Sequence, residues 1–293
     1  RLTEDEFWFS ISDSDLLLWL QGVNVSKKYD VEIDEIDVCP VQIQGPLSED
    51  LMAKLAGEEL REVPYYGILE TKVGGADCVI SQTGFTGEKG YEIYVRDAHE
   101  NAEKMWNAVL EAGEEFGLMV IAPAHHRRIA AGILSWGQDL DHETSPFQVN
   151  LSYQVPRNKA ADYIGKEELE KQRAMMDEGK APFKMKMVGL TLGGKEITDY
   201  APDFWIVTNT DEDEVGYVTS PWWSPELETN IALAWVPWEA SEVGTKYMVK
   251  LPDEYAESPG VAVNAEIVDV PFRESVNPNK REVQAAKGLD FAD

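Results

Sequence analysis

The feature that most constrains this chain is a glycine-rich stretch at residues 81–95, SQTGFTGEKGYEIYV. Gly84, Gly87 and Gly90 lie within seven positions of one another, and apolar strand patterns at residues 78–80 and 91–95 flank them. This pattern predicts a β-hairpin, because glycines that interrupt two strand patterns usually form the turn between them. A glycine loop can adopt positive φ and allows a flat ligand to approach the backbone closely.

The second strand of this hairpin is predicted to have two unlike faces. Alternation places Glu92 and Tyr94 on one face, and the opposite face carries an apolar set, Tyr91, Ile93 and Val95. Together with Phe85 on the loop, the carboxylate and the phenol would form a clamp for a flat heterocycle that is rich in hydrogen-bond donors. Spacing alone leaves an alternative open, in which the polar face of the hairpin only contacts water.

Composition excludes several classes of partner. The 293 residues carry 54 acidic and 26 basic side chains, a net charge of −28, which argues against binding to nucleic acid or to anionic membranes. The sequence has no apolar run of about 20 residues and no basic-apolar leader. Cys39 and Cys78 each lie in an apolar pattern and are expected to be reduced. These features predict a cytoplasmic protein.

Familiar catalytic motifs are missing from the sequence. No GxSxG motif, phosphate-binding loop or dinucleotide fingerprint is present. His125 and His126 are adjacent, but neighbours on a helix point about 100° apart, and no cysteine or carboxylate stands at ligand spacing from them. We therefore predict no metal site.

The string TGFTGEKGYE resembles the T-G-Y-T-G-E-x-G-[FY]-E signature of the folate-dependent aminomethyltransferase family. That family includes the glycine-cleavage T protein and the tetrahydrofolate-dependent demethylase of dimethylsulfoniopropionate. The similarity extends over residues 4–272 through further segments in the family's order: FWFSISDSDLLLWL, VQIQGPLSEDLMAKL, RRIAAGILSWGQDLD, SPFQVNL, DYIGKEEL, VGYVTSPWWSPELETNIALAWVP and AEIVDVPF.

The resemblance implies an α+β fold of the folate-binding aminomethyltransferase type with a C-terminal β-barrel, jelly-roll-like in form. We expect a folate-binding α+β domain at residues 1–158, a connecting helix and linker at 159–182, a barrel at 183–275 and a polar tail at 276–293. The residues support this division, because helical patterns at 97–116, 124–135 and 167–176 give way to short strand patterns. Those patterns lie at residues 184–192, 205–208, 215–219, 231–236, 246–250 and 261–268.

The first 60 residues are predicted to hold strands at 7–11, 29–36 and 38–44 and helices at 14–21 and 48–56, with Ser12 or Asp13 as a cap and Gly22 as a stop. The chain begins at Arg1, directly before a strand pattern, which suggests a fragment. In relatives, a preceding segment carries an aspartate near the reacting nitrogen of the folate. The catalytic carboxylate is therefore expected upstream of Arg1, and no catalytic residue is assigned here.

The resemblance also implies that tetrahydrofolate is the cofactor and supplies roles for four residues. Glu92 would accept paired hydrogen bonds from the pterin NH groups, Phe85 would stack on the ring, and Tyr94 would lie in or beside the same cleft. Arg128 is also assigned to cofactor binding. Ala130 replaces a glutamate that is usual in the family two positions after this arginine.

Three activities remain open within this resemblance. A demethylase would transfer a methyl group from a sulfonium, ammonium or aryl ether donor, whereas a T protein would transfer a methylene group from a lipoyl-bound aminomethyl group. The third alternative is a folate-binding relative without catalysis. WFSISDSD, SWGQDLD and GEEFGL are more similar to the demethylase branch, so the expected partner is a small methyl donor such as a sulfonium.

Overall fold

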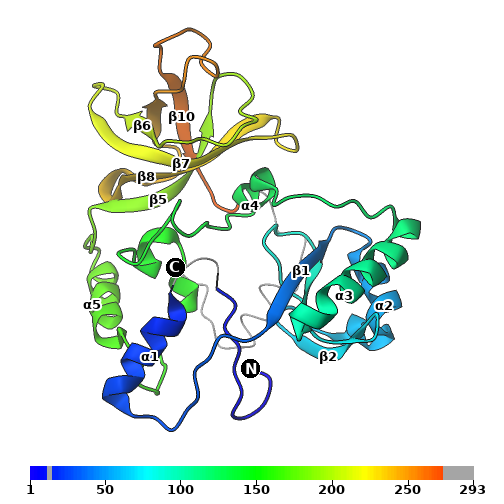
Figure 1. Cartoon of the computed structure of the whole chain (residues 1–293). Coiled ribbons are helices and arrows are strands. Elements are labelled where there is room, and N and C mark those ends of the chain that lie inside the picture. Colours follow the sequence, from blue (N-terminus) through cyan, green and yellow to red (C-terminus); the bar gives the residue numbers. More distant parts are fainter. Residues whose placement is uncertain (12–14, 273–293) are drawn as a thin grey trace.

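The computed structural model describes residues 1–11 and 15–272, and two β structures dominate it: a four-stranded sheet and a closed barrel (Figure 1). The predicted α+β architecture with a C-terminal barrel is confirmed. The barrel is one closed sheet of six strands, so a barrel rather than a two-sheet jelly roll is the form that the chain adopts.

The sheet is antiparallel throughout and has the strand order β1-β4-β3-β2. Its strands are β1 (Val38–Gln44), β2 (Ile68–Val73), β3 (Ala76–Ser81) and β4 (Gly90–Arg96). Helices α2 (Ser48–Ala56) and α3 (Ala98–Gly113) cover one face, where they form a core with apolar residues of β4 such as Tyr91 and Ile93. The two-faced strand expected at residues 91–95 is therefore present, with alternate side chains buried.

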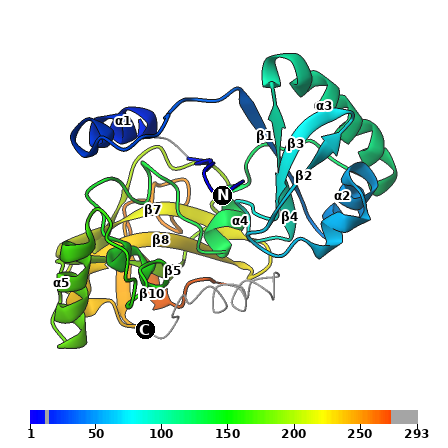
Figure 2. The same cartoon turned by 90° about the horizontal axis from the view of Figure 1, so that it is seen from below.

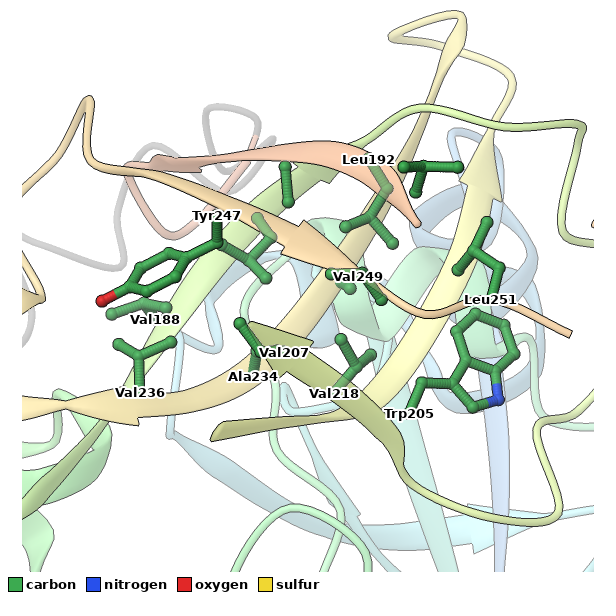
Figure 3. Close-up of a cluster of buried hydrophobic side chains, with 14 of the residues drawn as sticks. Val188, Leu192, Trp205, Val207, Val218, Ala234, Val236, Tyr247, Val249 and Leu251 are labelled. Atoms are coloured by element: carbon green, nitrogen blue, oxygen red, sulfur yellow. The ribbon is translucent and has the colours of Figure 1, made fainter. Parts of the chain in front are cut away.

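The barrel strands run in the order β10-β5-β8-β7-β6-β9. They are β5 (Met185–Leu192), β6 (Trp205–Thr208), β7 (Glu214–Ser224), β8 (Thr229–Pro237), β9 (Lys246–Val249) and β10 (Val263–Val268). Apolar side chains such as Val207, Val218 and Val249 fill the interior and are fully buried (Figure 3). The interior is thus a packed core that leaves the outer surface for contacts with other segments.

Besides the cores of the sheet and the barrel, a further apolar cluster lies on the outer surface of the barrel, where it packs against the segment between the sheet and the barrel. Met187, Leu233 and Trp235 of the barrel pack against Ile129 of α4 (His125–Ala130) and Val149 of the 3-10 helix Pro146–Val149. Figures 1 and 2 both show α4 between the barrel and the sheet. This short helix therefore connects the two β structures.

Helix α4 is shorter than the predicted helix at 124–135. It ends at Ala130 because Gly132 adopts a left-handed conformation, with φ +68°. A side chain is excluded there as well, since a Cβ on Gly132 would lie 2.5 Å from the side chain of Val270.

Helices α1 (Leu16–Lys27) and α5 (Lys166–Asp177) lie outside these cores. Helix α1 continues through Gly22, which was wrongly predicted to end it, and it has no buried residue. Both views show α1 away from the sheet (Figure 2). The predicted cap at Ser12 or Asp13 and the predicted tail at 276–293 lie outside the described residues.

Two predicted strands are wrong. Residues 7–11 and 29–36 form no ladder with any described residue, and a strand pattern without a pairing partner cannot satisfy its backbone groups as a sheet does. Over residues 1–11 and 15–272, no helix is long and apolar enough to cross a membrane.

Candidate functional site

Glu92 lies on the interior strand β4, opposite Gln42 of β1 and Ser81 of β3. Its side chain is on the face that α2 and α3 leave uncovered, and it is half-buried. The hydroxyl group of Thr83 donates a hydrogen bond to Glu92 Oε2, and the same hydroxyl lies 2.9 Å from Ser81 Oγ. The carboxylate is therefore fixed by its strand and by a neighbouring hydroxyl, yet remains accessible.

The glycine loop between β3 and β4 packs closely against β1. A Cβ on Gly84 would lie 2.7 Å from Gln42 Nε2, and a Cβ on Gly90 would lie 2.8 Å from the carbonyl oxygen of Ile43. Gly87 has the positive φ predicted for the loop, +73°. Phe85 is 37% exposed at the loop. The loop thus presents an aromatic ring beside a strand that carries a carboxylate.

Tyr94 lies two residues from Glu92 on the same face of β4 and is also half-buried. Burial raises the pKa of its hydroxyl, the hydrogen bond with Ser10 opposes this effect, and the charge of Glu92 adds to it. The distance from Tyr94 Oη to Ser10 Oγ is 3.3 Å. The structure therefore places Glu92 and Tyr94 on one face of the sheet, with Phe85 on the loop that leads into β4, and the roles of all three toward a ligand stay a prediction.

Sequence reasoning missed the adjacent tyrosines Tyr65 and Tyr66. Their ring centroids lie 4.1 Å apart with an angle of 47° between the planes. Tyr66 has φ +63°, a left-handed conformation that costs a residue with a side chain about 1–2 kcal/mol. The turn is held at β3, since Tyr66 N donates to the Gln82 carbonyl oxygen at 3.2 Å and Gln82 N donates to that of Gly67 at 3.1 Å.

The hydroxyl of Tyr65 has a pKa that is raised in the folded protein. Burial raises its pKa most, the hydrogen bond with Tyr66 raises it further, and the negative charge of Glu92 adds to the effect, as does Tyr153. Tyr153 belongs to the 3-10 helix Ser152–Gln154, in the loop that follows α4. In the sequence, Tyr65 and Tyr66 are visible as an aromatic dipeptide before Gly67. Their spacing from Glu92 does not indicate that they belong to the same region of the fold.

Arg128 lies away from solvent, with its side chain 1% exposed. Its Nη1 donates to Asp139 Oδ2 at 2.8 Å, its Nη2 donates to Ser220 Oγ at 2.8 Å, and its Nε lies 3.3 Å from His125 Nδ1. All three guanidinium nitrogens therefore have partners within the protein. The assignment of Arg128 to cofactor binding stays a prediction, and the contacts show an anchor between α4 and the barrel.

The residues around Arg128 form a second polar cluster. Asp139 also accepts hydrogen bonds from the hydroxyls of Thr219 and Ser220, each at 2.6 Å. His125 stacks on Trp222, and both burial and the positive charge of Arg128 lower its pKa. Among the residues that the structure describes, no group of three His, Cys, Asp or Glu side chains could hold a metal ion.

Arg127, the neighbour of Arg128, contacts the glycine loop instead. Its Nη1 lies 3.1 Å from Glu88 Oε1, and the Glu88 side chain is 15% exposed. This ion pair connects the loop that carries Phe85 to helix α4.

The region that holds the sheet and the region that holds the barrel match family models of the same kind of protein. Residues 1–159 match the model of the GCVT N-terminal domain, and residues 186–273 match the model of the glycine cleavage T-protein C-terminal barrel domain. The chain is 32% identical over 253 residues to dimethylsulfoniopropionate demethylase DmdA of Ruegeria pomeroyi, an alignment that covers 86% of this chain and 66% of that protein. It is 30% identical over 283 residues to an aminomethyltransferase of Geobacillus sp. (strain WCH70), covering 92% and 72%.

A solved structure shows the same fold. The glycine cleavage system aminomethyltransferase T of Bartonella henselae superposes with a TM-score of 0.64 at 21% identity, covering 88% of this chain and 66% of that one. The chain therefore spans about two thirds of the length of several of the proteins that it matches. Because family models match both the sheet region and the barrel, the chain belongs to the glycine-cleavage T-protein family.

Proposed function

We propose that the protein is a tetrahydrofolate-dependent one-carbon transferase that takes a methyl group from a small cationic donor, most simply a sulfonium such as dimethylsulfoniopropionate. The observation that carries this proposal is the accessible Glu92 carboxylate on β4, preceded in the chain by a glycine loop that carries the exposed ring of Phe85. Both the demethylase of Ruegeria pomeroyi and the aminomethyltransferases are relatives of this chain.

The residues present fit a pterin. A carboxylate accepts hydrogen bonds without donating any, which complements the amino and ring NH groups of a reduced pterin. Charge-assisted hydrogen bonds of this kind contribute about 1.5–3 kcal/mol each. The exposed ring of Phe85 offers a flat apolar surface, and Gly84 leaves no side chain between the loop and Gln42.

Tetrahydrofolate would supply the nucleophilic nitrogen N5 of the reaction. In the transfer, the carbon–sulfur bond of the donor breaks with its electron pair left on sulfur, a carbon–nitrogen bond forms, and the N5 proton is released. The task of Glu92 and Phe85 is then to hold the acceptor ring in line with the donor, and such positioning can contribute about 7–11 kcal/mol to catalysis. No proton acceptor is assigned among the described residues.

Calorimetry of the full-length protein with tetrahydrofolate tests the carboxylate directly. We expect Glu92→Ala to weaken tetrahydrofolate binding about tenfold or more, because the variant loses at least one charge-assisted hydrogen bond. Glu70→Ala, on the edge strand β2, is the matched control and should leave the affinity unchanged. Equal affinities of wild type and Glu92→Ala would remove Glu92 from the site.

The reaction itself is tested by incubating the protein and tetrahydrofolate with sulfonium, betaine and methoxyaryl donors. We expect 5-methyltetrahydrofolate and the demethylated donor. The alternative function is that of an aminomethyltransferase, which the 30% identity to the Geobacillus protein favours. Production of 5,10-methylenetetrahydrofolate from an aminomethyl-lipoyl protein, with no methyl transfer from any donor, would support this alternative and overturn the proposal.

A further inference from the structure

A chain of two hydroxyl groups leads to the carboxylate of Glu92. The hydroxyl oxygen of Thr83 lies within hydrogen-bond distance of Glu92 Oε2 on one side and 2.9 Å from Ser81 Oγ on the other. An ionised carboxylate accepts hydrogen bonds and donates none, so the single proton of the Thr83 hydroxyl is directed to Glu92. The Ser81 hydroxyl then donates to Thr83 Oγ1, and the direction of both hydrogen bonds is determined.

The backbone on each side of Thr83 is anchored. Gln82 is buried, and its backbone N donates to the carbonyl oxygen of Gly67 at 3.1 Å. On the other side, a Cβ on Gly84 would lie 2.7 Å from Gln42 Nε2, so the chain packs closely there as well. Threonine is also branched at Cβ, which restricts the rotation of its side chain. The hydroxyl of Thr83 is therefore held in place by the fold itself.

Ser81 is anchored in the sheet. It lies directly opposite Glu92 in the ladder between β3 and β4, so both side chains are on the same face. Its side chain has little freedom, because the residue is only 9% exposed. Thr83 follows two residues later and bridges these two side chains. The donor to the carboxylate thus belongs to a hydrogen-bonded chain that begins at a buried residue.

This arrangement restricts the conformation of the Glu92 side chain. A glutamate has three side-chain torsions, and a ligand that orders them on binding loses affinity through the entropy of that ordering. The hydrogen bond from Thr83 to Oε2 removes part of this freedom in the folded protein. The other carboxylate oxygen is then presented in a defined direction.

We propose that Thr83 is a positioning residue of the acceptor site: its hydroxyl, oriented by Ser81, holds the Glu92 carboxylate in the conformation that binds the NH groups of the acceptor ring. This inference rests on the proposed function. It assigns to Thr83 an effect on affinity that passes entirely through Glu92.

A double-mutant cycle tests this dependence. Tetrahydrofolate affinity would be measured by calorimetry on the full-length protein with Thr83→Val, with Glu92→Ala and with both changes. Thr83→Ser restores the hydroxyl, and Ser81→Ala removes the group that orients it. Thr71→Val is the matched control, because Thr71 is a half-buried threonine of β2 whose hydroxyl donates to the carbonyl oxygen of Ala56 at 3.4 Å. Urea unfolding on the same preparations reports the stability of each variant.

We expect Thr83→Val to weaken binding about twofold to tenfold, as the ordering of one more side chain does. Thr83→Ser should recover most of this loss, and Thr71→Val should bind as the wild type does. Ser81→Ala should cause a smaller loss, which disappears when residue 83 is already valine. In the Glu92→Ala background, Thr83→Val should have no further effect.

Two results would overturn the role of Thr83. One is an unchanged affinity in Thr83→Val. The other is an equal loss with and without Glu92, because Thr83 would then contact the ligand itself or support the loop in general. Either result leaves the proposed function intact as long as Glu92→Ala weakens binding. Absence of tetrahydrofolate binding by the wild type would instead reject the proposed function and this inference together, so the two failures are distinguishable.

Discussion

Arg127 and Arg128 are neighbours on α4, yet their guanidinium groups bind different parts of the molecule. Arg127 lies 3.1 Å from Glu88 in the glycine loop, whereas Arg128 lies 2.8 Å from Asp139 and binds Ser220 of the barrel. The loop beside Glu92 and the outer surface of the barrel are therefore connected through two consecutive residues.

Replacing Arg128 should destabilise the fold strongly. Arg128→Met leaves the fully buried carboxylate of Asp139 without its cation, and such a change costs about 3–5 kcal/mol. Urea unfolding of wild type and variant measures this difference. Arg157→Met is the matched control, since Arg157 pairs with Asp177 at the surface and its loss should cost about 1 kcal/mol or less. A change in Arg128→Met no larger than in this control would contradict a stabilising role for the buried pair.

The Arg127–Glu88 pair should affect ligand binding more than stability. Arg127 is 44% exposed, so Arg127→Gln should change the free energy of unfolding by about 0.2–1 kcal/mol. We expect tetrahydrofolate affinity to fall nonetheless, because the loop that carries Phe85 loses a contact with α4. Calorimetry and urea unfolding on the same preparations separate the two effects. An unchanged affinity would show that the loop is held without this pair.

His125 should make stability depend on pH. Burial and the charge of Arg128 lower the pKa of His125 in the folded protein, whereas the unfolded chain has the ordinary value of about 6.5. Between these two pKa values the unfolded chain therefore binds a proton more readily than the folded protein does. The stability that His125 contributes is thus present above a pH of about 6.5 and is lost as pH falls from there toward the lower folded-state value. Urea midpoints at pH 7.5 and 5.5 should differ less in His125→Gln than in wild type. His142→Gln, at an exposed histidine, is the control and should retain the wild-type difference.

Gly216 on β7 should tolerate no side chain. A Cβ there would lie 2.1 Å from the carbonyl oxygen of Trp235, a backbone atom of the paired strand β8. We expect Gly216→Ala to lower the free energy of unfolding by about 1–3 kcal/mol, as overpacking does. Gly22→Ala in α1 has open space and should be neutral or raise stability by about 0.5–1 kcal/mol. Thermal unfolding compares the two, and equal effects would mean that β7 shifts freely to accommodate the methyl group.

The parts of the fold that could be predicted are those in which the pattern of neighbouring residues determines the secondary structure. Alternation along β4 separated Glu92 and Tyr94 from the buried residues, and the short strand patterns after residue 182 indicated the barrel. Residues 29–36 show the limit of the same reasoning, because an apolar alternating segment becomes a strand only where a partner strand is available.

The parts of the candidate site that were not predictable depend on contacts between distant residues. The hydrogen bond between Tyr66 N and the carbonyl oxygen of Gln82 joins two turns that no periodicity of the sequence relates. Burial of Arg128 depends on Asp139 and on Ser220, which lies in the barrel 92 residues further along the chain. Sequence alone suggests that Arg128 is a surface or ligand-binding residue, whereas the structure shows that it is buried and links α4 to the barrel.

The interior position of β4 has a consequence for binding kinetics. Glu92 belongs to a strand with a ladder on each side, to β1 through Gln42 and to β3 through Ser81. Its backbone is preorganised, so a ligand meets an acceptor whose position was set during folding, and little conformational entropy is lost when the two associate. Association should then proceed without a slow rearrangement of the sheet. Differences in affinity among variants around Glu92 are accordingly expected in the dissociation rate.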